Sequence, residues 1–210
     1  MFGDILNPKE AIMKKIKPLK EMLIKMRDLS DLMIELGYAA ILQHDTELAE
    51  EVDIIKAEIR ELTYDMRISA MYAAKGLSTE EIEQIASLLQ IGVAVKEISD
   101  GMDDLVEIVA RGVHPVIEAA YRKDTIIKKM VVEQGCKIEN KSLEKAKIPE
   151  ETGFTIRAIK RQGEWIFEPT AKTVLKKGDI IFLKGKDVAI RKMVEYAKAK
   201  KEEKKTEHNK

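Results

Sequence analysis

Apolar residues recur every three or four positions through the first half of the chain, as they do on one face of an α-helix. Pro18 interrupts this pattern, which predicts a short first helix or a break there, because proline cannot donate a helical hydrogen bond. Asp45 or Thr46 is suited to cap a second helix, and Ser78 with Glu81 forms a capping box for a third. Connections this short join antiparallel neighbours, so we expect a helical bundle. Long helices are predicted over residues 19–42, 46–75 and 78–111, and a short one over residues 115–122.

Near Asp124 the helical spacing gives way to short alternating or wholly apolar runs. Gln162 and Gly163 form a two-residue turn between two such runs, which is typical of a β-hairpin. Asn140 and Asp187 are suited to cap two further helices. Strands are predicted over residues 126–133, 154–161, 165–167 and 180–183, and helices over residues 141–146 and 188–197.

These elements predict an α+β chain, with an antiparallel helical bundle followed by a small β-rich α+β domain. The charge distribution agrees with two units, although the whole chain has a formal net charge of zero. Residues 28–111 contain 19 acidic and 6 basic residues, whereas residues 112–210 contain 24 basic and 15 acidic ones. We expect one domain over residues 1–123, a second over residues 124–197, and a charged disordered tail over residues 198–210.

Composition also argues against several functions. Many lysines of the basic half fall in the tail without aromatic residues to stack bases, so nucleic-acid binding is not expected. The single cysteine, Cys136, cannot form an internal disulfide. No apolar run approaches the roughly 18 residues that span a bilayer, and the N-terminus lacks a signal-peptide pattern. A cytoplasmic protein is therefore expected.

Residues suited to catalysis are scarce. The three histidines, His44, His114 and His208, have no partners at metal-ligand spacing. The sequence contains no nucleophile motif, no glycine-rich phosphate loop and no strand followed by Gly-x-Gly-x-x-Gly. We expect neither an enzyme nor a bound cofactor such as NAD or ATP.

The predicted hairpin and the strand after it carry a family pattern. The pattern reads I-x-A-I-x-R-x-G, then a proline, then x-L-x-x-G-D-x-L, and it resembles the TrkA C-terminal (RCK C-terminal) domain, a regulatory module of potassium transport systems. The residues at the matching places are Ile156, Ala158, Ile159, Arg161, Gly163, Pro169, Leu175, Gly178 and Asp179.

This resemblance implies a homodimer that regulates potassium or cation transport. It also implies a groove between two copies that binds a cyclic dinucleotide, cyclic di-AMP, as in some members of the family. Because side chains alternate along a strand, Thr155 is expected to face away from Phe154 and Ile156, toward the ligand. The alternative is that the matching residues only pack the core and the dimer. The candidate ligand-binding residues are Ile148, Pro149, Phe154, Thr155, Ile156 and Pro169.

The second and third predicted helices resemble the halves of a PhoU-like domain, a helical bundle associated with phosphate and ion transport. That family usually carries Glu-x-x-x-Asp motifs on two facing helices, which bind metal clusters. Here Lys56, Arg60 and Lys96 occupy three of the four positions, and only Asp100 keeps a carboxylate. We expect no metal at these positions, and instead an ion-pair network between the helices that also includes Asp104.

Two functions agree with these patterns. The first is a cytoplasmic accessory protein that regulates a membrane potassium or cation transporter by sensing a small ligand in a dimeric TrkA C-terminal domain. The second is an interaction or dimerisation protein that binds no ligand and is associated with phosphate or ion transport.

Overall fold

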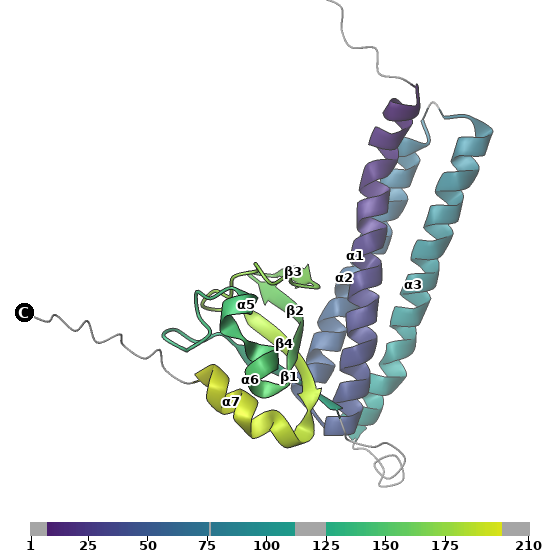
Figure 1. Ribbon diagram of the computed structural model, residues 1–210. Helices are drawn as coiled ribbons and strands as arrows, with labels where there is room; N and C mark the ends of the chain where they lie inside the picture. The colour runs from purple at the N-terminus through teal and green to yellow at the C-terminus, as the bar shows by residue number, and fades with distance from the viewer. Residues whose placement is uncertain (1–7, 76, 112–124, 199–210) are drawn as a thin grey trace, which may run out of the picture. The chain divides into compact units, whose positions relative to one another are not determined.

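A computed structural model describes residues 8–75, 77–111 and 125–198 (Figure 1). The chain divides into two compact units, Met1–Pro115 and Val116–Lys210. The predicted helix over residues 115–122, the predicted boundary after residue 123 and nearly all of the predicted tail lie outside the described residues.

The first unit is a bundle of long helices, α1 (Pro8–Gln43), α2 (Thr46–Ala73) and α3 (Thr79–Arg111), which run side by side in Figure 1. The predicted break at Pro18 is wrong, because α1 continues through it. Leu19, the next residue, is fully buried, so packing against the bundle offsets the missing hydrogen bond. The largest fully buried side chains of this unit are Leu19, Met26, Leu29, Met33, Leu36, Leu48, Ile55, Ile59 and Met66.

Both predicted caps of the bundle are confirmed. The Asp45 carboxylate accepts hydrogen bonds from the backbone N–H groups of Glu47, at 3.0 Å, and Leu48, at 3.2 Å. The Ser78 backbone N–H donates to Glu81 Oε2 at 2.7 Å, and the Glu81 N–H donates to Ser78 Oγ at 3.4 Å. These contacts satisfy N–H groups that the first helical turn leaves without partners.

The second unit contains a four-stranded antiparallel sheet in the order β1-β4-β2-β3. The strands are β1 (Thr125–Val131), β2 (Thr155–Arg161), β3 (Glu164–Phe167) and β4 (Ile180–Lys186). The predicted Gln162–Gly163 turn is confirmed, with φ of 52° and 88°, the left-handed geometry that a tight hairpin needs.

An irregularity in β2 decides which side chains face the core. The register shifts between Ile156 and Ala158, so that Ile156 pairs with Leu183, Ala158 with Phe182 and Ile159 with Ile181. Paired residues share a face of the sheet, so Ile156 and Ile159 lie on the same face although three positions separate them. Ala158 and Phe182 lie on the opposite face, where the Trp165 ring packs 5.4 Å from the Phe182 ring.

Three helices, α5 (Leu143–Ala146), α6 (Ile148–Thr152) and α7 (Ile190–Lys198), complete the core on the Ile159 face. The predicted cap Asn140 is wrong: Ser142 caps α5, and its Oγ accepts from the Lys145 N–H at 3.4 Å. Asp187 does not cap the last helix either, but begins a short 3₁₀ helix, Asp187–Ala189, that leads into α7. No helix in residues 8–75, 77–111 or 125–198 is long and apolar enough to cross a membrane.

Candidate functional site

A pocket of about 290 Å³ opens on the surface of the second unit. Its walls come from α5 and α6, from the first residues of β2, and from the chain that follows β3. The lining residues are Leu143, Glu144, Ile148, Pro149, Glu150, Thr155, Ile156, Pro169 and Ala171.

The local sequence explains how α5 and α6 form one wall. Lys147 joins the two helices in a left-handed conformation, with φ of 47°, so that α6 starts in a new direction. Pro149 lies in the first turn of α6, where its missing N–H costs nothing. Gly153 ends α6 in a left-handed conformation, with φ of 74°, and the chain then turns into β2. Ile148 and Glu150 of α6 thereby line the same pocket as Thr155 of β2.

A second wall contains Pro169 and Ala171, which belong to residues 169–175, a segment that we call the strap. It is held to the start of α5 by backbone hydrogen bonds: the Leu143 N–H donates to Thr173 O at 2.9 Å, and the Glu144 N–H donates to Ala171 O at 3.0 Å. The Leu175 N–H donates to Lys141 O at 3.0 Å. The pocket wall that contains Pro169 and Ala171 is therefore fixed by the backbone.

A partly buried ion pair between Arg161, at the end of β2, and Asp179 lies near the far end of the strap, and Arg161 also donates a hydrogen bond to the strap. Arg161 Nε donates to Asp179 Oδ1 at 2.8 Å, and Arg161 Nη2 donates to Asp179 Oδ2 and to Val174 O, both at 2.7 Å. Burial of Asp179 opposes its ionisation, but hydrogen bonds from Arg161 and from the Lys176 N–H outweigh it, so the pKa of Asp179 lies below its usual value. The resemblance includes both residues, and the structure shows that they are partners.

Five of the six candidate ligand-binding residues line this pocket, namely Ile148, Pro149, Thr155, Ile156 and Pro169. Phe154, the sixth, does not: its side chain is fully buried in the core. Thr155 is exposed and faces away from Phe154, as alternation predicts, but the half-buried Ile156 also lines the pocket.

Sequence reasoning missed four lining residues, Leu143, Glu144, Glu150 and Ala171. Leu143 and Ala171 belong to segments that pair only in three dimensions, so no local pattern reveals them. Pro149 was a usable signal for α6, which contributes Ile148 and Glu150 to the pocket, since proline is favoured in the first turn of a helix.

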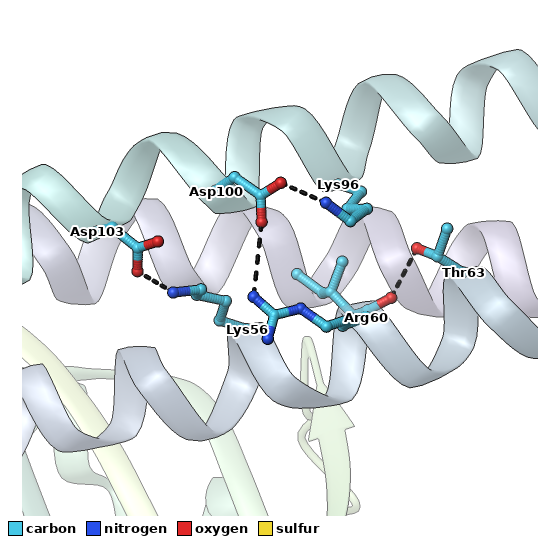
Figure 2. A network of polar contacts seen from close by, with 7 residues as sticks. Lys56, Arg60, Thr63, Lys96, Asp100 and Asp103 are labelled. Carbon is cyan, nitrogen blue, oxygen red and sulfur yellow. Dashed lines mark hydrogen bonds and ion pairs between the residues drawn. The ribbon is translucent and has the colours of Figure 1, made fainter.

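The bundle contains a network of ion pairs between α2 and α3 (Figure 2). Lys56 donates a hydrogen bond to Asp103, Lys96 donates one to Asp100, and Arg60 Nη2 lies 3.8 Å from Asp100 Oδ1. The hydrogen bond from Lys96 holds the pKa of Asp100 below its usual value. The predicted network is thus present, except that Asp103 occupies the role assigned to Asp104.

Three cationic side chains and the one carboxylate of Asp100 thus occupy the positions where the PhoU resemblance implies metal ligands, and Asp103 lies beside them. Within the described part of the chain, no group of three or more His, Cys, Asp or Glu side chains is arranged to hold a metal ion. Cys136 is buried with a free thiol, and His114 and His208 lie outside the described residues.

Comparison with known proteins places the pocket in a recognised domain. The family model described as "TrkA-C domain" matches residues 128–198. Those residues form a TrkA-C domain. The TrkA-C domain includes most of the sheet, α5–α7, the strap and every residue that lines the pocket.

The chain is 33% identical over 81 residues to "Probable potassium channel protein 2" of Methanocaldococcus jannaschii, a match that covers 39% of this chain and 24% of that protein. It thus spans about a quarter of that relative. The family model matches residues of the second unit, and the PhoU resemblance of the first unit stays a prediction.

Similar solved structures include the RCK_C domain dimer of S. agalactiae BusR with c-di-AMP, at 28% identity and a TM-score of 0.32, over 34% of this chain and 93% of that one. The RCK C domain of the potassium transport protein KtrA with c-di-AMP is 27% identical, with a TM-score of 0.30, over 37% of this chain and 86% of that one.

Proposed function

We propose that this protein is a cytoplasmic regulator of potassium or cation transport, which acts by binding a small ligand in its TrkA-C domain and performs no catalysis. The proposed state is a homodimer, and the proposed partner is a membrane potassium or cation transporter. The matched domain and the homology to a potassium channel protein support the regulatory part of this proposal.

The observation that carries the ligand-binding part is the pocket itself. It lies within the TrkA-C domain, and its lining includes five residues that the family resemblance assigns to a ligand. Ile148, Ile156 and the two prolines form apolar walls, which suit the flat faces of a nucleobase. Cyclic di-AMP, which the sequence resemblance implies, is the ligand we propose.

Isothermal titration calorimetry of the full chain with cyclic di-AMP tests this proposal. Thr155→Arg should abolish binding, because the arginine side chain fills the pocket. Thr155 is exposed, and its hydroxyl makes only a 3.4 Å contact with Lys184 O, so the variant should remain folded.

Glu164→Arg is the matched control. Glu164 is exposed beside the hairpin turn, at the opposite end of β2 from Thr155. Arg161, the residue paired with Glu164, is six positions along the strand from Thr155, roughly 20 Å at about 3.3 Å per residue, so the arginine introduced at position 164 cannot reach the pocket. Equal affinities for all three proteins, or no binding by the wild-type chain, would refute the proposed ligand site.

Sedimentation of the wild-type chain tests the homodimer independently. A dimer at micromolar concentration is expected with or without ligand. A dimer that binds no cyclic dinucleotide would favour the second function, in which the TrkA-C domain only dimerises.

A further inference from the structure

The two charged side chains that line the pocket are both acidic. Glu144 comes from α5 and Glu150 from α6, and both are exposed. None of the nine lining residues, all of which the structure describes, is a lysine, an arginine or a histidine. Lys145 and Lys147 lie on the same segment, but neither of them lines the pocket. The formal charge that the pocket presents to a ligand is therefore negative.

The remaining walls are mostly apolar. Leu143, Ile148 and Ile156 provide aliphatic surface, and Pro149 and Pro169 provide flat ring faces. A planar heterocycle can lie against such surfaces, and a carboxylate accepts hydrogen bonds from its amino or ring N–H groups. A phosphate in the same place would meet two carboxylates and no cationic side chain among the nine lining residues, which is unfavourable.

We infer that Glu144 and Glu150 are specificity-determining residues that select the ligand by charge and orient it. A heterocyclic base with N–H donors lies between the apolar walls against the carboxylates, and any phosphate stays at the mouth of the pocket in solvent. This inference rests on the proposed function and adds the chemical class that the pocket recognises: an amino-bearing base, and not a phosphate anion.

The salt dependence of binding distinguishes this mode from phosphate recognition. A protein that neutralises phosphates with lysine or arginine loses affinity as salt rises from about 50 to about 200 mM. Here salt screens a repulsion, so the affinity of the full chain for cyclic di-AMP should stay constant or rise by about twofold over that range. Adenosine, which carries no phosphate, should bind with an affinity independent of salt.

Glu144→Gln and Glu150→Gln test the two residues directly. Glutamine keeps a carbonyl oxygen that accepts a hydrogen bond, but it removes the charge. Each variant should bind cyclic di-AMP about threefold more tightly than the wild type, and its affinity should depend less on salt. Affinity for adenosine should change by less than about twofold in either variant, because no phosphate repulsion is relieved. Glu164→Gln, at the other end of β2, should change neither ligand's affinity.

Two results would overturn this inference alone: a wild-type affinity for cyclic di-AMP that falls steeply with salt, or glutamine variants that bind it no more tightly than Glu164→Gln does. Failure of the wild-type chain to bind either compound would instead remove the proposed ligand site, and this inference with it.

Discussion

The ring of Phe154 occupies the space where a Cβ atom on Gly185 would lie. A Cβ built on Gly185 would be 2.5 Å from Phe154 Cγ and 2.6 Å from both Cδ atoms. Phe154 directly precedes β2, Gly185 lies in β4, and the Phe154 side chain is fully buried. Because Gly185 has no side chain, the Phe154 ring can approach its backbone closely and fill the core next to β2, the strand whose first residues line the pocket.

Gly185→Ala should destabilise the TrkA-C domain by about 1 to 3 kcal/mol, because the added methyl overpacks a core with no room for it. Trp165 is the only tryptophan and packs on Phe182 in this domain, so its fluorescence during urea unfolding reports on the domain alone. A midpoint equal to that of the wild type would show that Phe154 moves away at little cost.

Acid should weaken the domain through Asp179. Its pKa is lowered in the folded state, so its ionisation contributes stability above the unfolded value of about 3.9. That stability is lost as pH falls through about 4 toward the lower folded pKa, because in this range the unfolded carboxylate binds a proton and the folded one does not. Unfolding free energy, measured by Trp165 fluorescence, should therefore fall steeply in this window.

Asp179→Asn provides the control, because the amide keeps the shape and removes the titration. It should cost about 2 to 3 kcal/mol at neutral pH, below the range for a fully buried pair because the Arg161 side chain is 24% exposed. The variant should also lose much of the steep fall below about pH 4. An identical acid profile in both proteins would show that other carboxylates control acid unfolding.

Periodicity and turn chemistry were enough to predict the helices of the bundle, both of its caps, the hairpin and β4. These features depend on local rules. Pro18 was misjudged because a proline signal is local, whereas the packing of Leu19 against the bundle is not. Asn140 was misjudged as a cap because it and Ser142 are both good capping residues that lie two positions apart.

Only the residues of the candidate site that lie in or next to the family pattern could be predicted from the sequence. Ile156 and Pro169 belong to the family pattern and Thr155 directly precedes it, and the structure places all three in one pocket. Glu144 and Ala171 meet there because the strap pairs with the start of α5, 27 residues away, and no pattern in the sequence signals this pairing. The sequence alone therefore could not predict that the charged side chains lining the pocket are acidic.

Two glycines of α3 should respond oppositely to alanine. Gly101 is exposed in the helix and has nothing within 4 Å of a built Cβ, so Gly101→Ala should stabilise the bundle by about 0.5 to 1 kcal/mol through helix propensity. At Gly92 a Cβ would lie 3.0 Å from Met66 Sδ, in the core. Gly92→Ala should therefore gain less than Gly101→Ala. Urea unfolding followed by helical circular dichroism measures both, and equal gains would show that Met66 moves freely.

The ion pairs of α2 and α3 should leave the bundle without a bound metal. Lys56, Arg60 and Lys96 surround the two carboxylates of Asp100 and Asp103, and a cation placed there would be repelled by three positive charges (Figure 2). Elemental analysis of the purified chain should therefore find no stoichiometric iron or zinc.

The triple variant Lys56→Glu, Arg60→Asp and Lys96→Glu places a Glu-x-x-x-Asp motif on each helix, so it should bind iron or zinc through oxygen ligands that meet between the helices. Metal in the wild-type chain that is lost in Asp100→Ala would contradict the alignment of these positions with the PhoU motif.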